Sequence, residues 1–212
     1  MEIQTSKAIQ FRQLHRGPSM LILPNAWDVA SARIFEDAGF PAPKINVVVM
    51  RGINDNELLD FAELTHRKAW SIRFIEYMPA TMDPEWGAHS IMAPEILERI
   101  KSRYALERIE KVSMAGPATN YKIPGAMGEI GVIAPLSSHF CGSCNRLRIT
   151  ATGEARGCLF SDRSIDLKPY LLRTDAELKK ALCEAAENKP RQHRLLDSQP
   201  QFTSFSMVQI GG

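Results

Sequence analysis

The sequence has 212 residues, of which 44% are hydrophobic and 24% are charged. This length is enough for one large or two small domains, and the composition excludes a disordered chain. The net charge of +2 does not produce the global field typical of a nucleic-acid-binding protein. Because no apolar run approaches the roughly 20 residues that span a bilayer, we expect a cytoplasmic protein with no nucleic-acid or membrane partner.

Short apolar runs alternate with helical segments in the first part of the chain. The pattern predicts strands at 20–24, 44–50 and 72–76, and helices at 28–38 and 56–67. Gly39 is expected to end the first of these helices. The run Lys44–Met50 (KINVVVM) is typical of a strand buried on both faces of a parallel sheet. Strands joined by helical crossovers indicate an α/β fold with a parallel sheet.

The remainder of the chain has a different character. A helix is predicted at 94–103, antiparallel strands separated by Gly and Pro turns at 118–160, and helices at 166–172 and 175–187. The polar, basic tail that follows, which contains Arg191 and His193, is interpreted as solvated. This second part is therefore expected to be an α+β, antiparallel domain.

The strongest signal is a group of three cysteines in the segment FCGSCNRLRITATGEARGC. Cys141 and Cys144 are separated by two residues, and Cys158 follows after 13 more. In a reducing compartment such cysteines are more often ligands than disulfide partners. The first pair can chelate one metal from a tight turn that Gly142 allows, whereas the third must approach from elsewhere in space.

A hairpin between the cysteines predicts how they meet. The tripeptide 151–153 (Ala-Thr-Gly) suits a type I turn closed by a left-handed glycine. That register pairs Thr150 with Glu154, Arg148 with Arg156, and Arg146 with Cys158. Cys158, Arg146 and Arg148 then share one face, and the turn of Cys141 and Cys144 lies at the open end of the same hairpin.

Cysteine spacing alone favours zinc and iron–sulfur about equally. Structural zinc takes four ligands, and the fourth would be Cys183, His139 or His193. A 4Fe–4S cluster is normally held by four cysteines. With three, one iron remains open for a substrate.

The same segment resembles the second-cluster motif of the GTP 3′,8-cyclase family, the radical S-adenosylmethionine lyases that open molybdenum-cofactor synthesis. The similarity extends over residues 44–212. It includes KINVVVMRGINDNEL, IRFIEYMP and NYKIPGAMGEIGVIAPLSSHFC. The resemblance implies one 4Fe–4S cluster, bound GTP and a barrel that uses S-adenosylmethionine.

The resemblance also assigns roles by position. It makes Cys141, Cys144 and Cys158 the cluster ligands, and it places Arg146, Leu147 and Arg148 at GTP. Lys44 matches a lysine on the GTP phosphates, and Met78 matches a residue beside S-adenosylmethionine. Gly211 and Gly212 match a tail that enters the active site.

Residues 8–42 instead resemble the start of the isocitrate lyase/phosphoenolpyruvate mutase family. We therefore expect a helix-strand-helix stub at 1–43, the end of a radical S-adenosylmethionine barrel at 44–90, and a cluster- and GTP-binding domain at 91–212. The fold expected is an incomplete parallel (β/α) barrel fragment followed by an α+β antiparallel domain carrying an iron–sulfur site.

The first cysteine of the sequence is Cys141, so the Cys-x3-Cys-x2-Cys motif of radical enzymes is absent from these residues. We therefore expect binding of the cluster and GTP without independent turnover, and no independent catalytic residue. A half barrel exposes strand edges, which favours a homodimer or a complementary barrel chain. The alternatives are a cluster- or nucleotide-binding module of a larger assembly, and a structural zinc domain.

Overall fold

The computed structural model describes residues 34, 37–39, 44–79, 84–110, 116–144 and 146–193. The chain divides into two compact units, Met1–Pro43 and Lys44–Gly212. All helices and strands described below belong to the second unit. The strand predicted at 20–24 and most of the helix predicted at 28–38 lie outside the described residues. Gly39 is described, and its φ of 80° is the left-handed conformation that commonly ends a helix.

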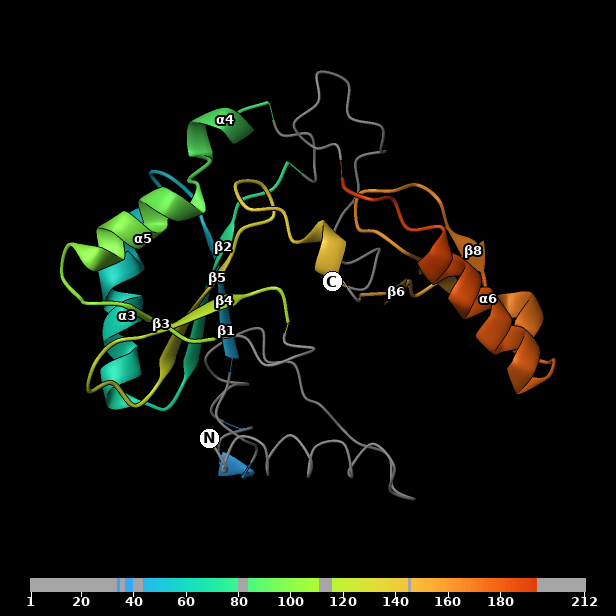
Figure 1. The fold of residues 1–212 in the computed structure, drawn as a ribbon, viewed down its shortest axis with the longest axis horizontal. Helices are drawn as coiled ribbons and strands as arrows, with labels where there is room; N and C mark the ends of the chain where they lie inside the picture. The colour runs from blue at the N-terminus through green and yellow to red at the C-terminus, as the bar shows by residue number, and fades with distance from the viewer. Residues whose placement is uncertain are drawn as a thin grey trace. The chain divides into compact units, whose positions relative to one another are not determined.

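A five-stranded mixed sheet is the main element of this unit (Figure 1). In spatial order its strands are β1 (Lys44–Val49), β2 (Ser71–Glu76), β5 (Glu129–Ile133), β4 (Thr119–Lys122) and β3 (Glu107–Arg108). The first three strands are parallel to one another. β4 pairs antiparallel with β5, and β3 pairs antiparallel with β4. The predicted α/β class is confirmed. The division predicted at residue 90 runs through this sheet, because β1 and β2 precede it and the other strands follow it.

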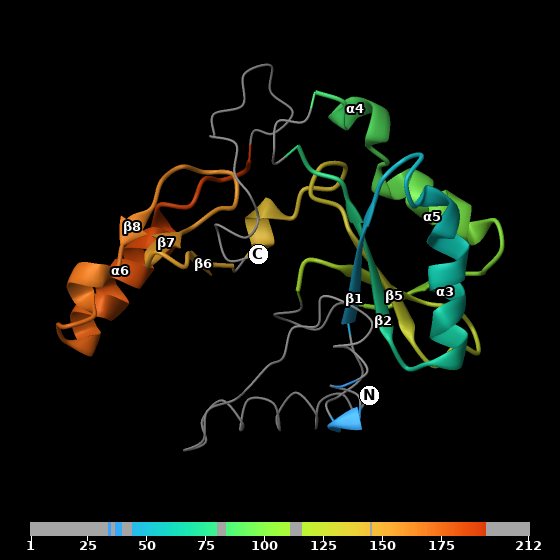
Figure 2. The same ribbon diagram turned by 180° about the vertical axis from the view of Figure 1, so that it is seen from behind.

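Two helices cover one face of the sheet. Figure 2 shows α3 (Leu58–Arg67) and α5 (Ala93–Lys101) next to each other, to the right of the parallel strands. Short helices η1 (Asp55–Glu57) and α4 (Trp86–His89) lie in the connections. The core between the sheet and the helices consists mainly of aliphatic side chains: Val47, Val49, Leu58, Ala62, Ile72, Phe74, Ile96, Ile100 and Ile130. Alternate residues of the strands supply this layer, and the residues between them face the opposite side.

The prediction that Lys44–Met50 is buried on both faces is wrong. Val47 and Val49 are buried, but Val48 between them is 42% exposed. Among the described strands, β1 is an edge strand that pairs with β2 alone. Its apolar sequence shows that it can be buried, but it does not show whether a second layer covers its outer face.

A second, three-stranded sheet contains the predicted hairpin. It consists of β6 (Arg148–Ile149), β7 (Glu154–Arg156) and β8 (Ile165–Asp166). Arg148 pairs with Arg156, and the Thr150 amide donates to the Glu154 carbonyl at 2.9 Å. Gly153 has a φ of 82°, as the three-residue turn requires. The predicted register is confirmed, although the ladder ends before Arg146 and Cys158.

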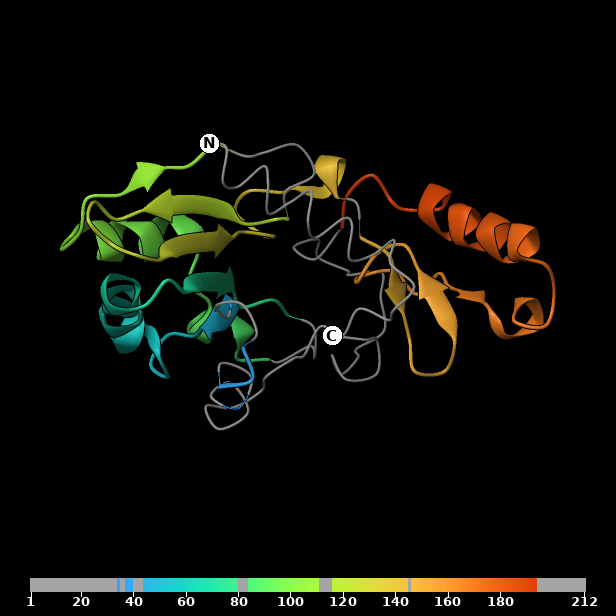
Figure 3. The same cartoon turned by 90° about the horizontal axis from the view of Figure 1, so that it is seen from below.

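Helix α6 (Asp175–Glu187) packs beside this sheet, as Figure 3 shows. Ala181 and Ala185 on the helix lie against Ala155 and Leu167. A capping box between Thr174 and Glu177 begins the helix, which stabilises its first turn. The bounds agree with the prediction of 175–187. The helix predicted at 166–172 is only a 3-10 turn, η3 (Lys168–Tyr170).

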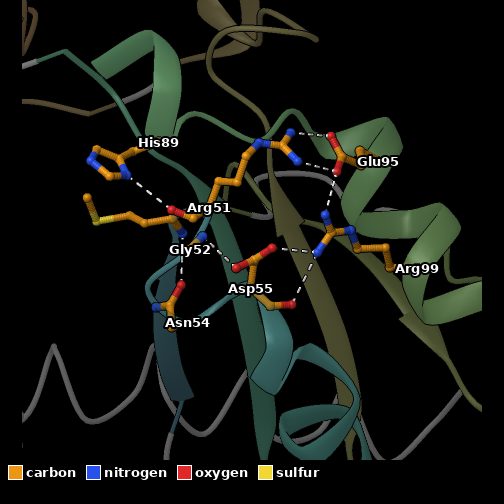
Figure 4. A network of polar contacts seen from close by, with 8 residues as sticks. Arg51, Gly52, Asn54, Asp55, His89, Glu95 and Arg99 are labelled. Carbon is orange, nitrogen blue, oxygen red and sulfur yellow. Dashed lines mark hydrogen bonds and ion pairs between the residues drawn. The ribbon is translucent and has the colours of Figure 1, made fainter. Parts of the chain in front are cut away.

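An ion-pair network fixes the segment that follows β1 (Figure 4). Arg51 binds both carboxylate oxygens of Glu95, at 3.1 and 2.8 Å. Arg99 donates to Asp55 at 2.8 Å and to Glu95 at 2.7 Å. These pairs join the loop after β1 to α5. Within the described residues, no helix is long and apolar enough to cross a membrane.

Candidate metal and nucleotide site

The sheet face opposite the helices is polar at its centre. Asn46, Arg73 and Gly131 are neighbours across β1, β2 and β5. Ile75 and Ile133 form the next row toward the carboxyl ends of the strands. A Cβ atom at Gly131 would lie 3.1 Å from the Arg73 Cγ atom. The absence of a side chain at Gly131 therefore leaves room for Arg73 to lie across the sheet.

The loop after β5 leads into the cysteine turn. Cys141 begins the short helix η2 (Cys141–Ser143), and the Cys144 amide donates to the Cys141 carbonyl at 3.2 Å. This bond closes the tight turn that the Cys-x2-Cys spacing predicts. Cys158 follows β7 at the open end of the hairpin. All three cysteines are free thiols of intermediate exposure.

One cavity brings the cysteine turn, the hairpin and the polar face of the sheet together. Its volume is about 360 Å³, and its walls include all three cysteines, Arg73, Arg146 and Arg148. The predicted convergence of three thiols and two arginines is therefore observed. Phe140 lies under Arg146, whose guanidinium carbon is 5.5 Å from the ring centre.

The cavity is strongly basic. Four cationic side chains line it, namely Arg73, Arg146, Arg148 and Lys189, and no carboxylate is among its described lining residues. Burial lowers the pKa of Arg73, and the nearby Arg146 lowers it further, against the opposing effect of Glu129. The Arg73 Nε atom is buried and has no hydrogen-bond partner among the described residues. Such a group favours an anionic ligand, which would supply the missing acceptor.

The thiols lie close enough to influence one another. Burial raises the pKa of the Cys158 thiol, and the charges of Cys141 and Cys144 raise it further. Burial also lowers the pKa of Arg148, while the Cys144 and Cys158 thiolates oppose that change. Three neighbouring thiolates repel one another unless a metal compensates their charge. The donor set therefore fits a bound metal or cluster.

Lys189 fastens the cysteine turn to the end of α6. Its Nζ atom donates to the carbonyls of Cys144 at 2.7 Å and Arg146 at 2.8 Å. The strand end after β7 also lies close to α6 at Gly157. A Cβ atom at Gly157 would lie only 2.5 Å from the Ala185 carbonyl oxygen. Only glycine fits there without a shift of the backbone.

Glu76 fixes the loop that leads to the cysteines. It is fully buried. Its carboxylate accepts hydrogen bonds from the amides of Leu136 at 2.7 Å and Ser137 at 3.1 Å, and from the Ser137 hydroxyl. It also accepts from the Ala93 amide at 2.8 Å. Helix α5 has no capping side chain of its own, so Glu76 fills that role from β2.

The expectation of a solvated His193 is wrong. His193 is only 9% exposed, and its Nε2 atom lies 2.7 Å from the Pro135 carbonyl oxygen. Burial lowers the pKa of His193, and His139 lowers it further, while the Pro135 carbonyl raises it. The basic composition of the tail gave no sign that this ring packs inside.

Of the other predicted site residues, some line the cavity and others lie away from it. Met78 lines the cavity and packs near Cys158. Lys44 is exposed at the start of β1 and is not among the cavity residues, although it lies on the same sheet face as Asn46. Leu147 packs on the α6 side of the hairpin. Cys183 is exposed on α6, away from the cavity lining, and Gly211 and Gly212 lie outside the described residues.

Asn46, Arg73 and Lys189 were not singled out from the sequence, although they line the cavity. For Arg73 a signal existed. It stands between Ile72 and Phe74 in IRFIE, and both neighbours are fully buried. A charged residue alternating with core residues marks the strand face that meets solvent or a ligand. Lys189 follows helix α6 and does not alternate with buried residues, so no comparable signal for it exists in the sequence.

Comparison with known proteins identifies the family. The family described as Molybdenum Cofactor Synthesis C matches residues 70–195, which is more than half of the chain and includes all three cavity cysteines. The chain belongs to the Molybdenum Cofactor Synthesis C family. A second family, described as Phosphoenolpyruvate phosphomutase, matches residues 11–116. The resemblance predicted for the first residues is thus also found, and the two matches overlap at 70–116.

Several relatives of this chain are named GTP 3′,8-cyclase. That of Geobacter sulfurreducens is 49% identical over 176 residues, which are 82% of this chain and 54% of the relative. That of Moorella thermoacetica is 37% identical over 214 residues, which cover 100% of this chain and 64% of the relative. That of Syntrophomonas wolfei is 40% identical, over 80% of this chain and 53% of the relative. The chain therefore spans about half the length of most of these relatives.

Proposed function

We propose that this chain is the cluster- and GTP-binding part of a GTP 3′,8-cyclase in molybdenum-cofactor biosynthesis. In this proposal Cys141, Cys144 and Cys158 hold one 4Fe–4S cluster. The observation that carries it is the shared cavity, where three free thiols meet four cations without an opposing carboxylate in the described lining. The names of the relatives support the choice of GTP.

The donor set favours a cluster over a closed zinc site. Structural zinc takes four ligands from the protein, and three cysteines line the cavity. Of the other candidate zinc ligands, Cys183 is exposed on α6 and His139 is not among the cavity residues. His193 lines the cavity, but its Nε2 atom already lies 2.7 Å from the Pro135 carbonyl oxygen. A cluster bound by three thiolates would supply one iron with an open coordination position, at which a purine can bind.

The cations fit the other end of a nucleotide. A triphosphate carries several negative charges, and the planar guanidinium of arginine offers paired donors to its oxygens. Arg73 lies on the sheet face, whereas Arg146 and Arg148 lie on the cysteine turn and hairpin. In this arrangement the phosphates would bind between the two, with Leu147 at the same hairpin and Lys44 further along the sheet face. Gly211 and Gly212 would complete the site.

Independent turnover is not part of this proposal. The family resemblance implies S-adenosylmethionine beside Met78, but these residues contain no cysteine before Cys141 to hold a first cluster. We propose that β1 and β2 are the end of a barrel, preceded by a mutase-like stub at 1–43 and followed by the binding domain. The edge of β1 that has no partner among the described strands would then meet a second copy or a complementary barrel chain. A complete lyase reaction would need ligands from outside these residues.

Nucleotide binding by anaerobically reconstituted protein tests the proposal. We expect Arg146→Met and Arg148→Met each to weaken GTP binding about 10- to 100-fold, because each removes a charged hydrogen bond worth roughly 1.5–3 kcal/mol. Arg108→Met, on the exposed strand β3, is the matched control and should bind as the parent does. Equal GTP affinity in the parent, both site variants and cluster-free protein would show that GTP is not bound in this cavity.

A further inference from the structure

The aromatic ring of Phe140 lies against the guanidinium of Arg146 in the wall of the cavity. Both residues line the cavity, and the guanidinium carbon of Arg146 is 5.5 Å from the ring centre. An aromatic face attracts a cation over separations up to about 6 Å. Phe140 directly precedes the cysteine turn and Arg146 directly follows it. The tight turn therefore brings the two side chains together.

The electrostatic surroundings of Arg146 are repulsive. Burial is the main cause that lowers the pKa of Arg73 and of Arg148, and the charge of Arg146 lowers both further. Three guanidiniums therefore lie within electrostatic reach of one another, and no carboxylate is among the described lining residues. The negative face of an aromatic ring offsets part of this repulsion. Phe140 thus stabilises Arg146 in a place that the other two cations disfavour.

The backbone at Arg146 is fixed independently of the ring. The Lys189 Nζ atom donates to the Arg146 carbonyl at 2.8 Å and to the Cys144 carbonyl at 2.7 Å. The base of the arginine side chain is therefore held, whereas the side chain itself is exposed. An exposed arginine has many rotamers, and ordering it on binding costs affinity. The contact with Phe140 restricts this remaining freedom before a ligand arrives.

We propose that Phe140 is a positioning residue for the nucleotide, because its ring holds the guanidinium of Arg146 in the cavity wall in the orientation that binds an anion. This inference rests on the proposed binding of GTP and adds the residue that orients one of its arginines. A ring contact uses the face of the guanidinium and leaves the N–H groups at its edge to donate to phosphate oxygens. Phe140 acts through Arg146 and needs no contact with GTP.

A double-mutant cycle on anaerobically reconstituted protein tests the inference, with the affinity for GTP measured by titration calorimetry. Phe140→Leu keeps an apolar side chain but has no aromatic face, and Arg146→Met and the double variant complete the cycle. Tyr170→Leu is the matched control. It removes a ring that lies 5.8 Å from the Arg173 guanidinium carbon and is outside the described cavity lining. Iron analysis checks the cluster content of each variant.

We expect Phe140→Leu to bind GTP about three- to tenfold more weakly than the parent, because the guanidinium must then be ordered on binding. The same change in the Arg146→Met background should alter affinity by less than about twofold, and Tyr170→Leu should bind as the parent does. Equal affinity of the parent and Phe140→Leu, while Arg146→Met binds weakly, would overturn this inference and leave the proposed function intact. An equal loss in both backgrounds would also overturn it. Unchanged affinity of Arg146→Met would instead contradict the proposed GTP site.

A multiply fluorinated phenylalanine at position 140 separates the charge of the ring face from its shape. Fluorination removes the negative potential of the face but leaves an apolar ring beside Cys141, so the cysteine turn keeps its packing. GTP binding should weaken while the iron content stays that of the parent. Affinity equal to the parent's would show that Phe140 acts through packing alone and would overturn the inference.

Discussion

Glu76→Leu is the substitution that most directly tests how the loop before the cysteines is held. The carboxylate accepts from three backbone amides, those of Ala93, Leu136 and Ser137, and from the Ser137 hydroxyl. Leucine has a similar size but no acceptor. The change therefore leaves the amide that begins α5 and two amides in the loop without partners.

The expected loss in the free energy of unfolding follows from those three unpaired amides. A hydrogen bond to a charged group contributes roughly 1.5–3 kcal/mol, and a buried amide left unpaired costs about 1–3 kcal/mol. Relief of the desolvation of the buried carboxylate offsets part of this loss. We expect a net destabilisation of about 3–5 kcal/mol. Glu76→Gln keeps one acceptor oxygen and should lose about 2 kcal/mol.

Thermal unfolding followed by circular dichroism measures the effect. At about 2–4 °C per kcal/mol for a chain of this size, Glu76→Leu should lower the melting temperature by roughly 10 °C. Glu98→Gln, at an exposed position of α5, is the control and should change it by no more than about 2 °C. A melting temperature of Glu76→Leu within 2 °C of the parent, or one equal to that of Glu98→Gln, would refute the role given to this carboxylate.

Three further predictions concern the cavity and the ion-pair network. Lys189→Met should leave secondary structure unchanged but lower the iron retained after gel filtration about two- to fivefold, because two carbonyls of the cysteine turn lose a charged donor of about 1 kcal/mol; equal retention would contradict this. Gly131→Ala should weaken GTP binding about five- to tenfold, since crowding of about 1 kcal/mol displaces the arginine beside it; titration of the parent and variant compares them. Hydrogen bonds from arginine lower the pKa of Asp55 and of Glu95, so their stabilisation is present above the carboxyl pKa of the unfolded chain and is lost as the pH falls. The melting-temperature difference between the parent and Arg99→Met should therefore shrink from pH 7 to pH 3, and a constant difference would exclude the ion pairs as its cause.

Local features of the fold were predictable from the sequence. The hairpin register follows from its turn, because Gly153 takes the left-handed conformation that a three-residue loop needs. The bounds of α6 follow from a continuous helical pattern with Thr174 as its cap. In both cases the residues that decide the structure are neighbours in the chain.

Features that depend on distant residues were not predictable. β5 pairs with β2 in parallel, with Ile130 opposite Ile72, although more than fifty residues separate them. The exposure of Val48 depends on which layers surround β1. In the site, the cysteines were found from their spacing. Lys189 was missed and the burial of His193 was not expected, because only the return of the chain after α6 brings them to the cavity.

Metal and sulfide analysis after anaerobic reconstitution tests the central claim most directly. A 4Fe–4S cluster on Cys141, Cys144 and Cys158 requires about four iron and four sulfide per chain, and both should fall below about one in Cys158→Ser. Cys183→Ser, which changes the exposed cysteine on α6, should keep the full content. A parent protein without iron and sulfide, or equal contents in the parent and Cys158→Ser, would contradict the assignment of the three cavity cysteines as cluster ligands.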